Sequence, residues 1–361
     1  MEGNENLEAT HPGKYLADKL SEQSMSRKEL AIRTGFSEKH VSTVINGQKS
    51  ISPSFAKKLE YALKIPASDW LNRQNEYDSA LLDYEEKNNI SAEELAILKP
   101  LKDILEYMNQ FQLLPKILSE PEKILELRKL LRVSSLSVIP KIPYNAAYRA
   151  QISNNVAVDA YVLYAWQCLC ERLTEKVSIN STLDTDLLRE KLPEVKSLMF
   201  VEPNAMRERL TKIFAECGIA FCIVKHFRGA PVQGFIKRTE RGQLILCMTI
   251  RQKRADIFWF TLFHEIAHVL NGDADERFVD FSSVKTESEA RADEFARDTL
   301  LDKISYKNFL NADDFSESAV KEFATSQNVL PCIVTGRLQS DGIIGWDCLS
   351  STLRYYEWLE T

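Results

Sequence analysis

Apolar residues recur at intervals of three and four along the first 80 residues, and this spacing predicts five short helices there. The second and third of these helices, at residues 26–35 and 37–46, are joined by a tight turn through Phe36. The apolar positions that would pack the two helices together are Leu30, Ala31, Val41, Val44 and Ile45. Two short helices joined in this way inside a helical bundle predict a helix-turn-helix.

Signals at the helix ends support these boundaries. Ser26 lies three residues before Glu29, which is the spacing of a capping box, and Gly35 is typical of a helix C-terminus. Ser52 and Pro53 are typical of the N-cap and the first helical position of the next helix. The sequence therefore predicts where three of the helices begin or end.

After the bundle the pattern changes. Residues 84–150 are charged and leucine-rich, with a helical period broken by prolines, and predict a helical connector or a helix pair that meets a partner. The runs at 219–224 and 243–250 predict β-strands, with a glycine-punctuated strand and turn between them at 229–242. A strongly apolar helix follows at 254–270.

These elements predict a mostly α fold of the α+β class in three parts. Residues 1–83 would form a five-helix bundle, 84–150 the helical connector, and 151–361 a domain with a small mixed sheet and a C-terminal helical subdomain. That subdomain has the sequence pattern of a second helix-turn-helix: a helix, an Asn-Val turn, and a helix that ends at Gly342. We expect this pair to pack on the rest of the domain.

Composition places the chain among soluble proteins. It has 361 residues, of which 44% are hydrophobic and 27% charged, enough for two or three domains. It has no apolar run of about 18 residues, and its polar, acidic N-terminus is unlike a secretory signal, so we expect a cytoplasmic protein with no membrane partner. The seven cysteines are scattered, and we expect free, buried thiols.

The charge is distributed unevenly. The formal net charge is −6, yet the stretch 25–65 holds eight Lys and Arg against three Glu. A local excess of basic residues is what a surface that faces DNA phosphates requires. In the recognition helix 37–46 we expect outward side chains to meet the major groove, with the first of them near a phosphate. These candidate DNA-contacting residues are Ser37, Glu38, Lys39, His40 and Thr43.

The first 80 residues resemble a known family. From "HPGKYLADKL" at residue 11 to "WLNRQNEYD" near residue 80, the chain is similar to the Xre-type helix-turn-helix, and to its HigA-like antitoxin branch with an opening His-Pro-Gly. The motifs that carry the likeness are Leu-Ala, Gly-x-Ser and Ile-x-Asn-Gly. The resemblance implies binding to double-stranded operator DNA, and a homodimer, because operators of this kind are symmetric.

The stretch "FHEIAHVL" holds two of the chain's five histidines. Four residues advance a helix by about 400°, so His264 and His268 project from nearly one face and can reach one metal ion. Glu265 would lie beside the open coordination position, where it can take a proton from a zinc-bound water. The alternative is a core helix that carries two histidines, but a helix this apolar is a costly place for Glu265 without a role.

A catalytic zinc needs a third protein ligand. A histidine six residues after His268 is absent, because residue 274 is alanine. In gluzincin peptidases a glutamate from a later helix is the ligand, and an acid four residues on orients a ligand histidine; "TESEARADEFARDTLL" offers Glu289 and Asp293 in this arrangement. Glu287 is the alternative ligand.

Roughly residues 195–345 resemble the ImmA/IrrE family of zinc endopeptidases, which implies a zincin-like peptidase domain. The resemblance implies that Zn²⁺ binds and that Glu265 is the general base. The implied zinc ligands are His264, His268 and Glu289. Family members often have Asn where this chain has Asp293, a difference that leaves the orienting role intact. His226 and Arg291 are candidates for stabilising the transition state.

Together the two resemblances predict a DNA-binding transcriptional regulator with a zinc-dependent endopeptidase domain. Its substrate would be a repressor or other regulator protein, in a stress-response, mobile-element or toxin–antitoxin setting. The alternative is a HigA-like antitoxin and autorepressor whose peptidase-like domain binds a protein partner, such as a toxin, without turnover. A third interpretation treats the zinc as a structural staple.

Overall fold

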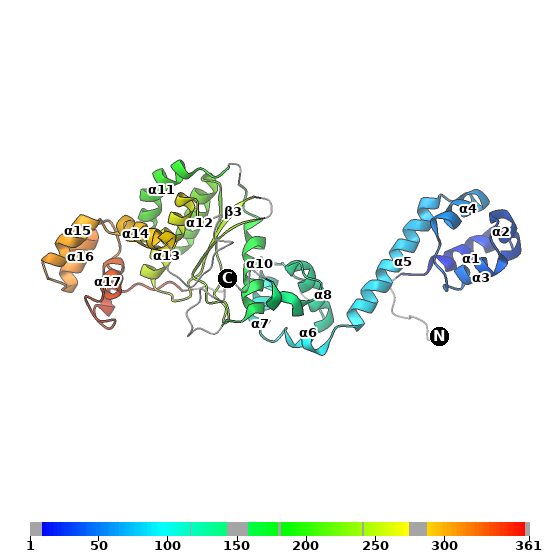
Figure 1. The fold of residues 1–361 in the computed structure, drawn as a ribbon, viewed down its shortest axis with the longest axis horizontal. Coiled ribbons are helices and arrows are strands. Elements are labelled where there is room, and N and C mark those ends of the chain that lie inside the picture. The colour runs from blue at the N-terminus through cyan, green and yellow to red at the C-terminus, as the bar shows by residue number, and fades with distance from the viewer. Residues whose placement is uncertain are drawn as a thin grey trace. The chain divides into compact units, whose positions relative to one another are not determined.

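The computed structural model describes residues 9–115, 117–142, 158–179, 182–239, 242–273 and 287–357. The chain divides into an N-terminal unit, Met1–Leu95 with Ser119–Leu125, and a C-terminal unit, Ala96–Leu118 with Glu126–Thr361. Most of the described chain is helical, with one small three-stranded sheet, which confirms the predicted fold class (Figure 1). Among the described residues, no helix combines the length and the apolar character needed to cross a membrane.

The N-terminal unit contains the predicted helices. They are α1 (Pro12–Glu22), α2 (Arg27–Thr34), α3 (Glu38–Ile45), α4 (Pro53–Leu63) and α5 (Ala67–Asn88). The last of them has 22 residues and is longer than the short helix that the pattern predicts. Their core is closed by fully buried Leu16, Leu30, Phe55 and Trp70.

The predicted caps of α2 and α4 are present. Ser26 Oγ accepts a hydrogen bond from the Glu29 N–H at 3.1 Å, and Gly35 ends the helix in the left-handed region with φ 73°. The capping box is only half formed, because the Glu29 carboxylate accepts from Arg33 at 2.6 Å. Ser52 caps α4 through the Phe55 N–H at 3.3 Å.

The opening His-Pro-Gly has a structural role. A Cβ on Gly13 would lie 2.0 Å from the Val44 carbonyl oxygen, so α1 can approach α3 this closely only with glycine here. His11 Nδ1 accepts from the Gly13 N–H at 2.9 Å and its ring meets Tyr77 of α5 edge-on at 4.8 Å. This tripeptide therefore ties three helices of the bundle together.

Helices make up much of residues 84–142, where the sequence predicts a helical connector, and residues 116 and 143–150 of that predicted connector lie outside the described residues. The helices here are α6 (Ala92–Ala96), α7 (Lys102–Gln110), α8 (Glu120–Leu131) and the 3₁₀ helix η1 (Leu136–Lys141). Part of this stretch packs into the C-terminal unit: the Tyr107 ring meets Phe227 at 5.5 Å, and Tyr164 OH donates to the Leu131 carbonyl.

The sheet of the C-terminal unit has the predicted mixed character. Its strands are β1 (Ile219–Ile223), β2 (Gly234–Arg238) and β3 (Leu244–Met248), in the order β1-β3-β2. β1 and β3 run parallel, whereas β2 and β3 run antiparallel. Because β3 lies in the middle, β1 and β2 are the edge strands. α10 (Ala160–Thr174) lies against the sheet, and Trp166 contacts Phe235 of β2 at 5.6 Å.

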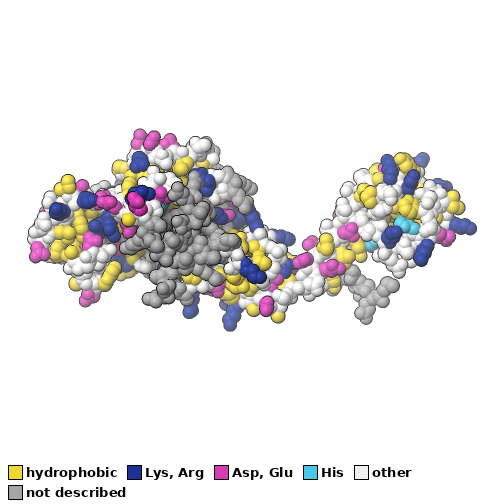
Figure 2. Space-filling model, in the orientation of Figure 1, with side chains coloured by type: hydrophobic (Ala, Val, Ile, Leu, Met, Phe, Trp, Pro, Cys, Tyr) yellow, Lys and Arg dark blue, Asp and Glu magenta, His cyan; other side chains and the backbone are white. Residues whose placement is uncertain are grey.

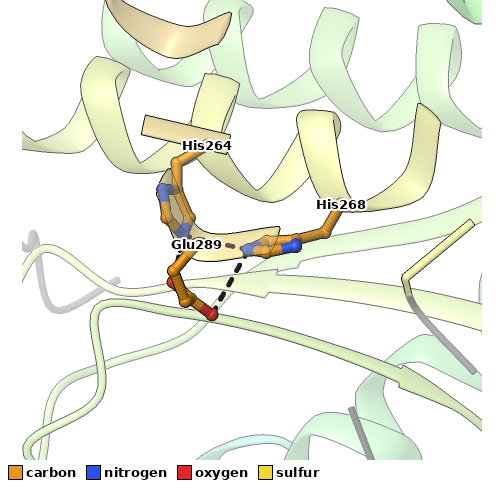
Figure 3. Close-up of side chains that lie close together, drawn as sticks. All are labelled: His264, His268 and Glu289. Atoms are coloured by element: carbon orange, nitrogen blue, oxygen red, sulfur yellow. Dashed lines mark hydrogen bonds and ion pairs between the residues drawn. The ribbon is translucent and has the colours of Figure 1, made fainter. Parts of the chain in front are cut away.

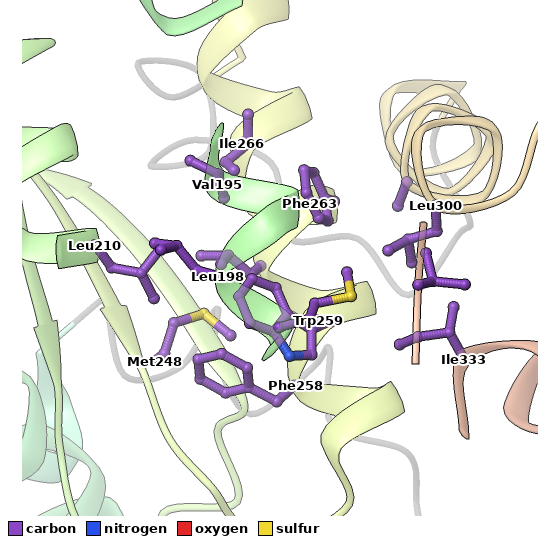
Figure 4. Packing of buried hydrophobic residues seen from close by; sticks show 14 of the residues in the cluster. Val195, Leu198, Leu210, Met248, Phe258, Trp259, Phe263, Ile266, Leu300 and Ile333 are labelled. Carbon is purple, nitrogen blue, oxygen red and sulfur yellow. The ribbon is translucent and has the colours of Figure 1, made fainter. Parts of the chain in front are cut away.

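The other helices of the C-terminal unit surround its core. They are α11 (Thr185–Ser197), α12 (Pro203–Glu216), α13 (Ala255–Asn271), α14 (Glu287–Leu300), α15 (Lys303–Asn311), α16 (Glu317–Ser326) and α17 (Pro331–Ser340), with short 3₁₀ helices η2 (Leu198–Phe200) and η4 (Ser350–Thr352). In Figure 4, Trp259 and Phe263 of α13 meet apolar side chains from α11, α12, β3, α14 and α17. α13 is thus the central helix of this core.

The predicted C-terminal helix pair is α16 and α17, joined through Asn328 at φ 52°. The pair packs on α13, as expected: a Cβ on Gly336 of α17 would lie 2.2 Å from Asp256 Oδ2. Arg254 donates to Asp256 and to Gln339 at 2.8 Å each, so the start of α13 is fixed to α17.

Candidate functional site

Both histidines belong to α13, and the apolar sequence of this helix buries most of its residues. It ends at Gly272, which adopts the left-handed region with φ 77°. His268 is 0% exposed and Glu265 is 3% exposed, so two polar side chains lie inside an otherwise apolar helix. Buried polar groups of this kind are costly unless they are hydrogen-bonded or bind an ion.

The histidines and a glutamate of α14 form a compact cluster (Figure 3). His264 Nε2 lies 3.1 Å from His268 Nε2 and 3.2 Å from Glu289 Oε2, and His268 Nε2 lies 3.5 Å from Glu289 Oε1. Ligand atoms about 2.0–2.2 Å from a tetrahedral zinc lie roughly 3.3–3.6 Å from one another. Two imidazoles with one carboxylate is a donor set typical of zinc; the 3.5 Å spacing lies in that range, and the other two are 0.1–0.2 Å shorter than its lower limit.

Two aspartates hold the imidazoles in the orientation that a metal requires. His264 Nδ1 lies 2.9 Å from Asp293 Oδ1, and His268 Nδ1 lies 3.2 Å from Asp273 Oδ2. With each Nδ1–H donated to a carboxylate, both Nε2 lone pairs point into the cluster. Two lone pairs and a carboxylate facing one another could hold a cation.

Asp273 is a residue that the sequence argument missed. Its N–H donates to the His268 carbonyl at 3.0 Å, in the turn that closes α13 after Gly272, and this turn brings its carboxylate back to the ring of His268. Arg291 of α14 lies 3.8 Å from the other carboxylate oxygen. In the sequence, Asp273 could have been recognised as an acid that directly follows Gly272, the glycine that ends the helix with the two histidines.

The charges of the cluster shift the pKa of its members. Burial lowers the pKa of His264, but hydrogen bonds to Asp293 and Glu289 and the nearby charge of Glu265 outweigh it and raise this pKa to about 9. The hydrogen bond from His264 lowers the pKa of Asp293. Without a metal, a proton on His264 partly balances the acidic groups around it.

We expect Asp293→Ala and Asp273→Ala each to weaken zinc binding by about 10–100-fold, because each imidazole loses the acceptor that orients it. Competition with a chelating dye measures this affinity. Asp298→Ala removes an exposed acid of α14 and is expected to leave the zinc affinity unchanged. Equal affinity in all three variants would show that the aspartates do not position the histidines.

Glu265 lies against the edge strand of the sheet. A Cβ on Gly234, the first residue of β2, would lie 2.7 Å from Glu265 Oε1 and 2.8 Å from Thr261 Cγ2. Only glycine leaves room for the carboxylate beside the strand. The carboxylate therefore lies beside the start of β2, and it is close enough to the histidine cluster for its charge to raise the pKa of His264.

The remaining candidates, Glu287, Arg291 and His226, differ in their contacts with the histidine cluster. Glu287, the alternative ligand, has a side chain 88% exposed and pairs with Arg291 at 3.7 Å. Arg291 reaches the cluster through Asp273. His226 follows β1, and its Nδ1 is buried with no hydrogen-bond partner among the described residues, but no contact joins it to His264.

The candidate DNA-contacting residues lie on or just before α3. Ser37 caps the helix by accepting from the His40 N–H at 3.1 Å, and Ser37, Glu38 and Lys39 are exposed. Thr43 is partly exposed, and its hydroxyl donates to the His40 carbonyl at 2.8 Å. Val41 is fully buried, in agreement with the predicted core face of α3.

His40 differs from the other four because its ring is engaged in packing. It meets Phe36 at 4.6 Å and Phe55 at 4.9 Å between ring centroids, and burial lowers its pKa. Its Nδ1 lies 3.3 Å from Lys49 Nζ. His40 thus helps to fix the start of α3 against α4.

Basic side chains are prominent on the N-terminal unit. Figure 2 shows Lys and Arg spread over its helical bundle, whereas acidic side chains gather along the later part of α5. This agrees with the excess of basic residues at 25–65 and with the acidic stretch near residues 83–86. Positive charge is thus available around α3.

No family profile matches the chain, and no curated protein matches it either. Several solved structures are similar to it, each with a TM-score of 0.21. A HigA-family addiction-module antidote from Coxiella burnetii is 26% identical, over 23% of this chain and 95% of its own. A protein from Nostoc punctiforme, described from its sequence as an antidote protein of a plasmid maintenance system, is 34% identical, over 22% of this chain and 90% of its own.

The antitoxin HigA of Pseudomonas aeruginosa, solved with the higBA promoter, is 28% identical, over 23% of this chain and 96% of its own. A TM-score of 0.21 carries no argument about function. What these comparisons give is a likeness between HigA-family antitoxins and the N-terminal part of this chain.

Proposed function

We propose that this chain is a DNA-binding regulator with a zinc-dependent endopeptidase in its C-terminal unit. The observation that carries the proposal is the cluster of two imidazole Nε2 atoms and the Glu289 carboxylate, with Glu265 buried beside it. Each imidazole is oriented by an aspartate. A structural zinc would be closed by a fourth protein ligand, whereas among the described residues this cluster has three.

The residues around the cluster have distinct roles in peptide hydrolysis. His264, His268 and Glu289 would hold a zinc ion, which would lower the pKa of a bound water and polarise the peptide carbonyl. Glu265 takes the proton of the attacking water and passes it to the leaving amine. Burial of its carboxylate beside Gly234 keeps it in one position, so the proton acceptor is held in place before a substrate arrives.

β2 supports a peptide as the substrate. It is one of the two outer strands of the sheet, and an extended peptide can add to such an edge through main-chain hydrogen bonds. Its first residue, Gly234, touches Glu265, so a peptide on this edge passes the general base. The proposed substrate is therefore an extended segment of a protein, and a repressor or regulator bound at the same promoter is the candidate.

A HigA-like antitoxin and autorepressor is the second candidate function. It is favoured by the N-terminal unit, whose His-Pro-Gly opening and helix-turn-helix carry the resemblance to that branch. In this case the C-terminal unit binds a toxin or another protein without turnover. Both functions share a homodimer on double-stranded operator DNA in the cytoplasm, and they differ in the chemistry of Glu265.

We expect Lys39→Ala and Thr43→Ala to weaken operator binding by about 1–3 kcal/mol for each base contact, or about fivefold to 150-fold in Kd. Lys39 is exposed near the start of α3, where a recognition helix meets base edges. Lys102→Ala removes an equally exposed charge from α7 and serves as the control. Unchanged binding in both variants, with loss after changes in 330–342, would place the DNA surface on the C-terminal helix pair.

The full proposal is tested in cells that express wild type, Glu265→Gln or the Lys39→Ala/Thr43→Ala double variant. A peptidase tethered to DNA meets proteins on the same promoter at an effective concentration of about the millimolar range. We expect the substrate protein to accumulate in Glu265→Gln cells, whose operator binding is intact, and in the double variant. Proteome-wide abundance and promoter output are the measurements.

A proteome that is identical in wild-type and Glu265→Gln cells would contradict the peptidase and favour the antitoxin. Loss of operator binding in Glu265→Gln would instead show that the variant is misfolded, since Glu265 and α3 belong to different units.

A further inference from the structure

Three cysteines from three elements meet on the face of the sheet that α10 covers. Cys222 of β1 and Cys247 of β3 are direct partners in the parallel register, and their Sγ atoms lie 3.2 Å apart. Cys170 of α10 is in hydrogen-bond contact with both. None of the three is used by the metal centre or by the core around α13.

The three cysteines differ in burial. Cys170 and Cys247 are fully buried, and Phe235, the β2 partner of Cys247, packs on Trp166 of α10. Cys222 lies on the edge strand β1 and is partly exposed. Cys222 is therefore the least buried of the three cysteines.

The thiols differ in acidity. Hydrogen bonds from Cys170 and Cys247 lower the pKa of Cys222 to about 5, whereas burial raises the pKa of both donors. Two thiols that donate to a third sulfur stabilise the thiolate form of that sulfur. The thiolate is the nucleophilic form of cysteine.

We propose that Cys222, Cys247 and Cys170 form a thiol–disulfide site that reacts with hydroperoxides. The Cys222 thiolate attacks the outer peroxide oxygen; an S–O bond forms and gives a sulfenic acid, and the O–O bond breaks. The alkoxide or hydroxide that leaves takes a proton from the solvent and departs as alcohol or water. Cys247 sulfur then attacks Cys222 sulfur; the S–S bond forms, the S–O bond breaks, and water leaves. Two thiols lose two electrons, and one hydroperoxide gains them.

The backbone already has the spacing that this disulfide needs. Neighbouring strands lie about 4.7–4.9 Å apart, and disulfides join Cα atoms about 4.4–6.8 Å apart. Cys170 is left as a third thiol, able to attack the new bond and exchange with either partner. The site is separate from the metal centre, because Phe221 and Leu246, the neighbours of Cys222 and Cys247 along the strands, face the core around α13.

The test uses the full chain with Cys348→Ser, which removes the exposed cysteine and leaves six thiols. After hydrogen peroxide, we expect the count of free thiols to fall by two and non-reducing peptide mapping to find a Cys222–Cys247 link. Dithiothreitol should restore both thiols. Cys222→Ser should abolish the link, whereas Cys332→Ser, a buried cysteine outside the cluster, should leave it in place.

Six free thiols after peroxide, or oxidation of Cys222 to sulfinic acid without a link, would overturn the proposal. The measurement on the Cys348→Ser chain decides this by itself if Cys222→Ser does not fold. Neither readout depends on peptide hydrolysis or on bound zinc.

Discussion

Glu265→Gln is expected to lower the rate of peptide hydrolysis by about 10²–10⁴-fold, which is the contribution of a positioned general base, and to leave the zinc content unchanged. Glutamine keeps the shape of the side chain in its buried place beside Gly234 but cannot accept the proton of the attacking water. Initial rates on a peptide library, normalised to zinc per chain, measure the effect.

Gly234→Ala tests the same position from the strand. Its Cβ would lie 2.7 Å from Glu265 Oε1, so the carboxylate must move, and we expect hydrolysis to fall while zinc is retained. For the change Glu265→Gln, the matched control is Glu294→Gln, at an exposed position of α14, and it should behave as wild type. Full activity of Glu265→Gln at full zinc occupancy would exclude Glu265 as the base.

One zinc per chain is the second expected result, with loss of that zinc in His264→Ala and in Glu289→Ala. Each change removes one of three donors whose contacts of 3.1–3.5 Å fit a single tetrahedral ion. Elemental analysis after dialysis against a mild chelator gives the stoichiometry, and Glu265→Gln should keep its zinc.

Glu287→Ala is the control for the third ligand, because its side chain is 88% exposed and pairs with Arg291. Zinc retained in Glu289→Ala and lost in Glu287→Ala would reverse the assignment. The zinc affinity, measured by competition with a chelating dye, should also depend on pH. The pKa of His264 is raised to about 9 without metal, so zinc must displace a proton from His264 at neutral pH. Affinity should therefore rise from pH 6 towards pH 9.

The two results separate the candidate functions. Zinc that depends on His264 and Glu289, together with hydrolysis that depends on Glu265, is the pattern of an enzyme. Zinc without hydrolysis of any peptide is the pattern of an antitoxin or a structural site, and the operator-binding variants then report the function that remains. The thiol site is independent of both outcomes, because its readout is the count of free thiols.

Local sequence determined much of the fold. Helical spacing, Ser26, Ser52 and the left-handed Gly35 predict the N-terminal bundle, because caps and short-range packing act within a few residues. The HExxH spacing likewise predicts that two imidazoles share one face of α13, since helix geometry alone decides it.

Contacts between distant segments required the tertiary structure. Asp273 reaches His268 through the turn that ends α13, Gly234 makes room for Glu265 from another element, and Cys222 meets Cys247 only through strand register. A spacing rule describes one element, whereas these contacts depend on how two elements pack. Sequence therefore named the ligand candidates on each helix and Asp293 beside them, whereas packing decided that Asp273 contacts His268, where the Glu265 carboxylate lies, and which thiols meet.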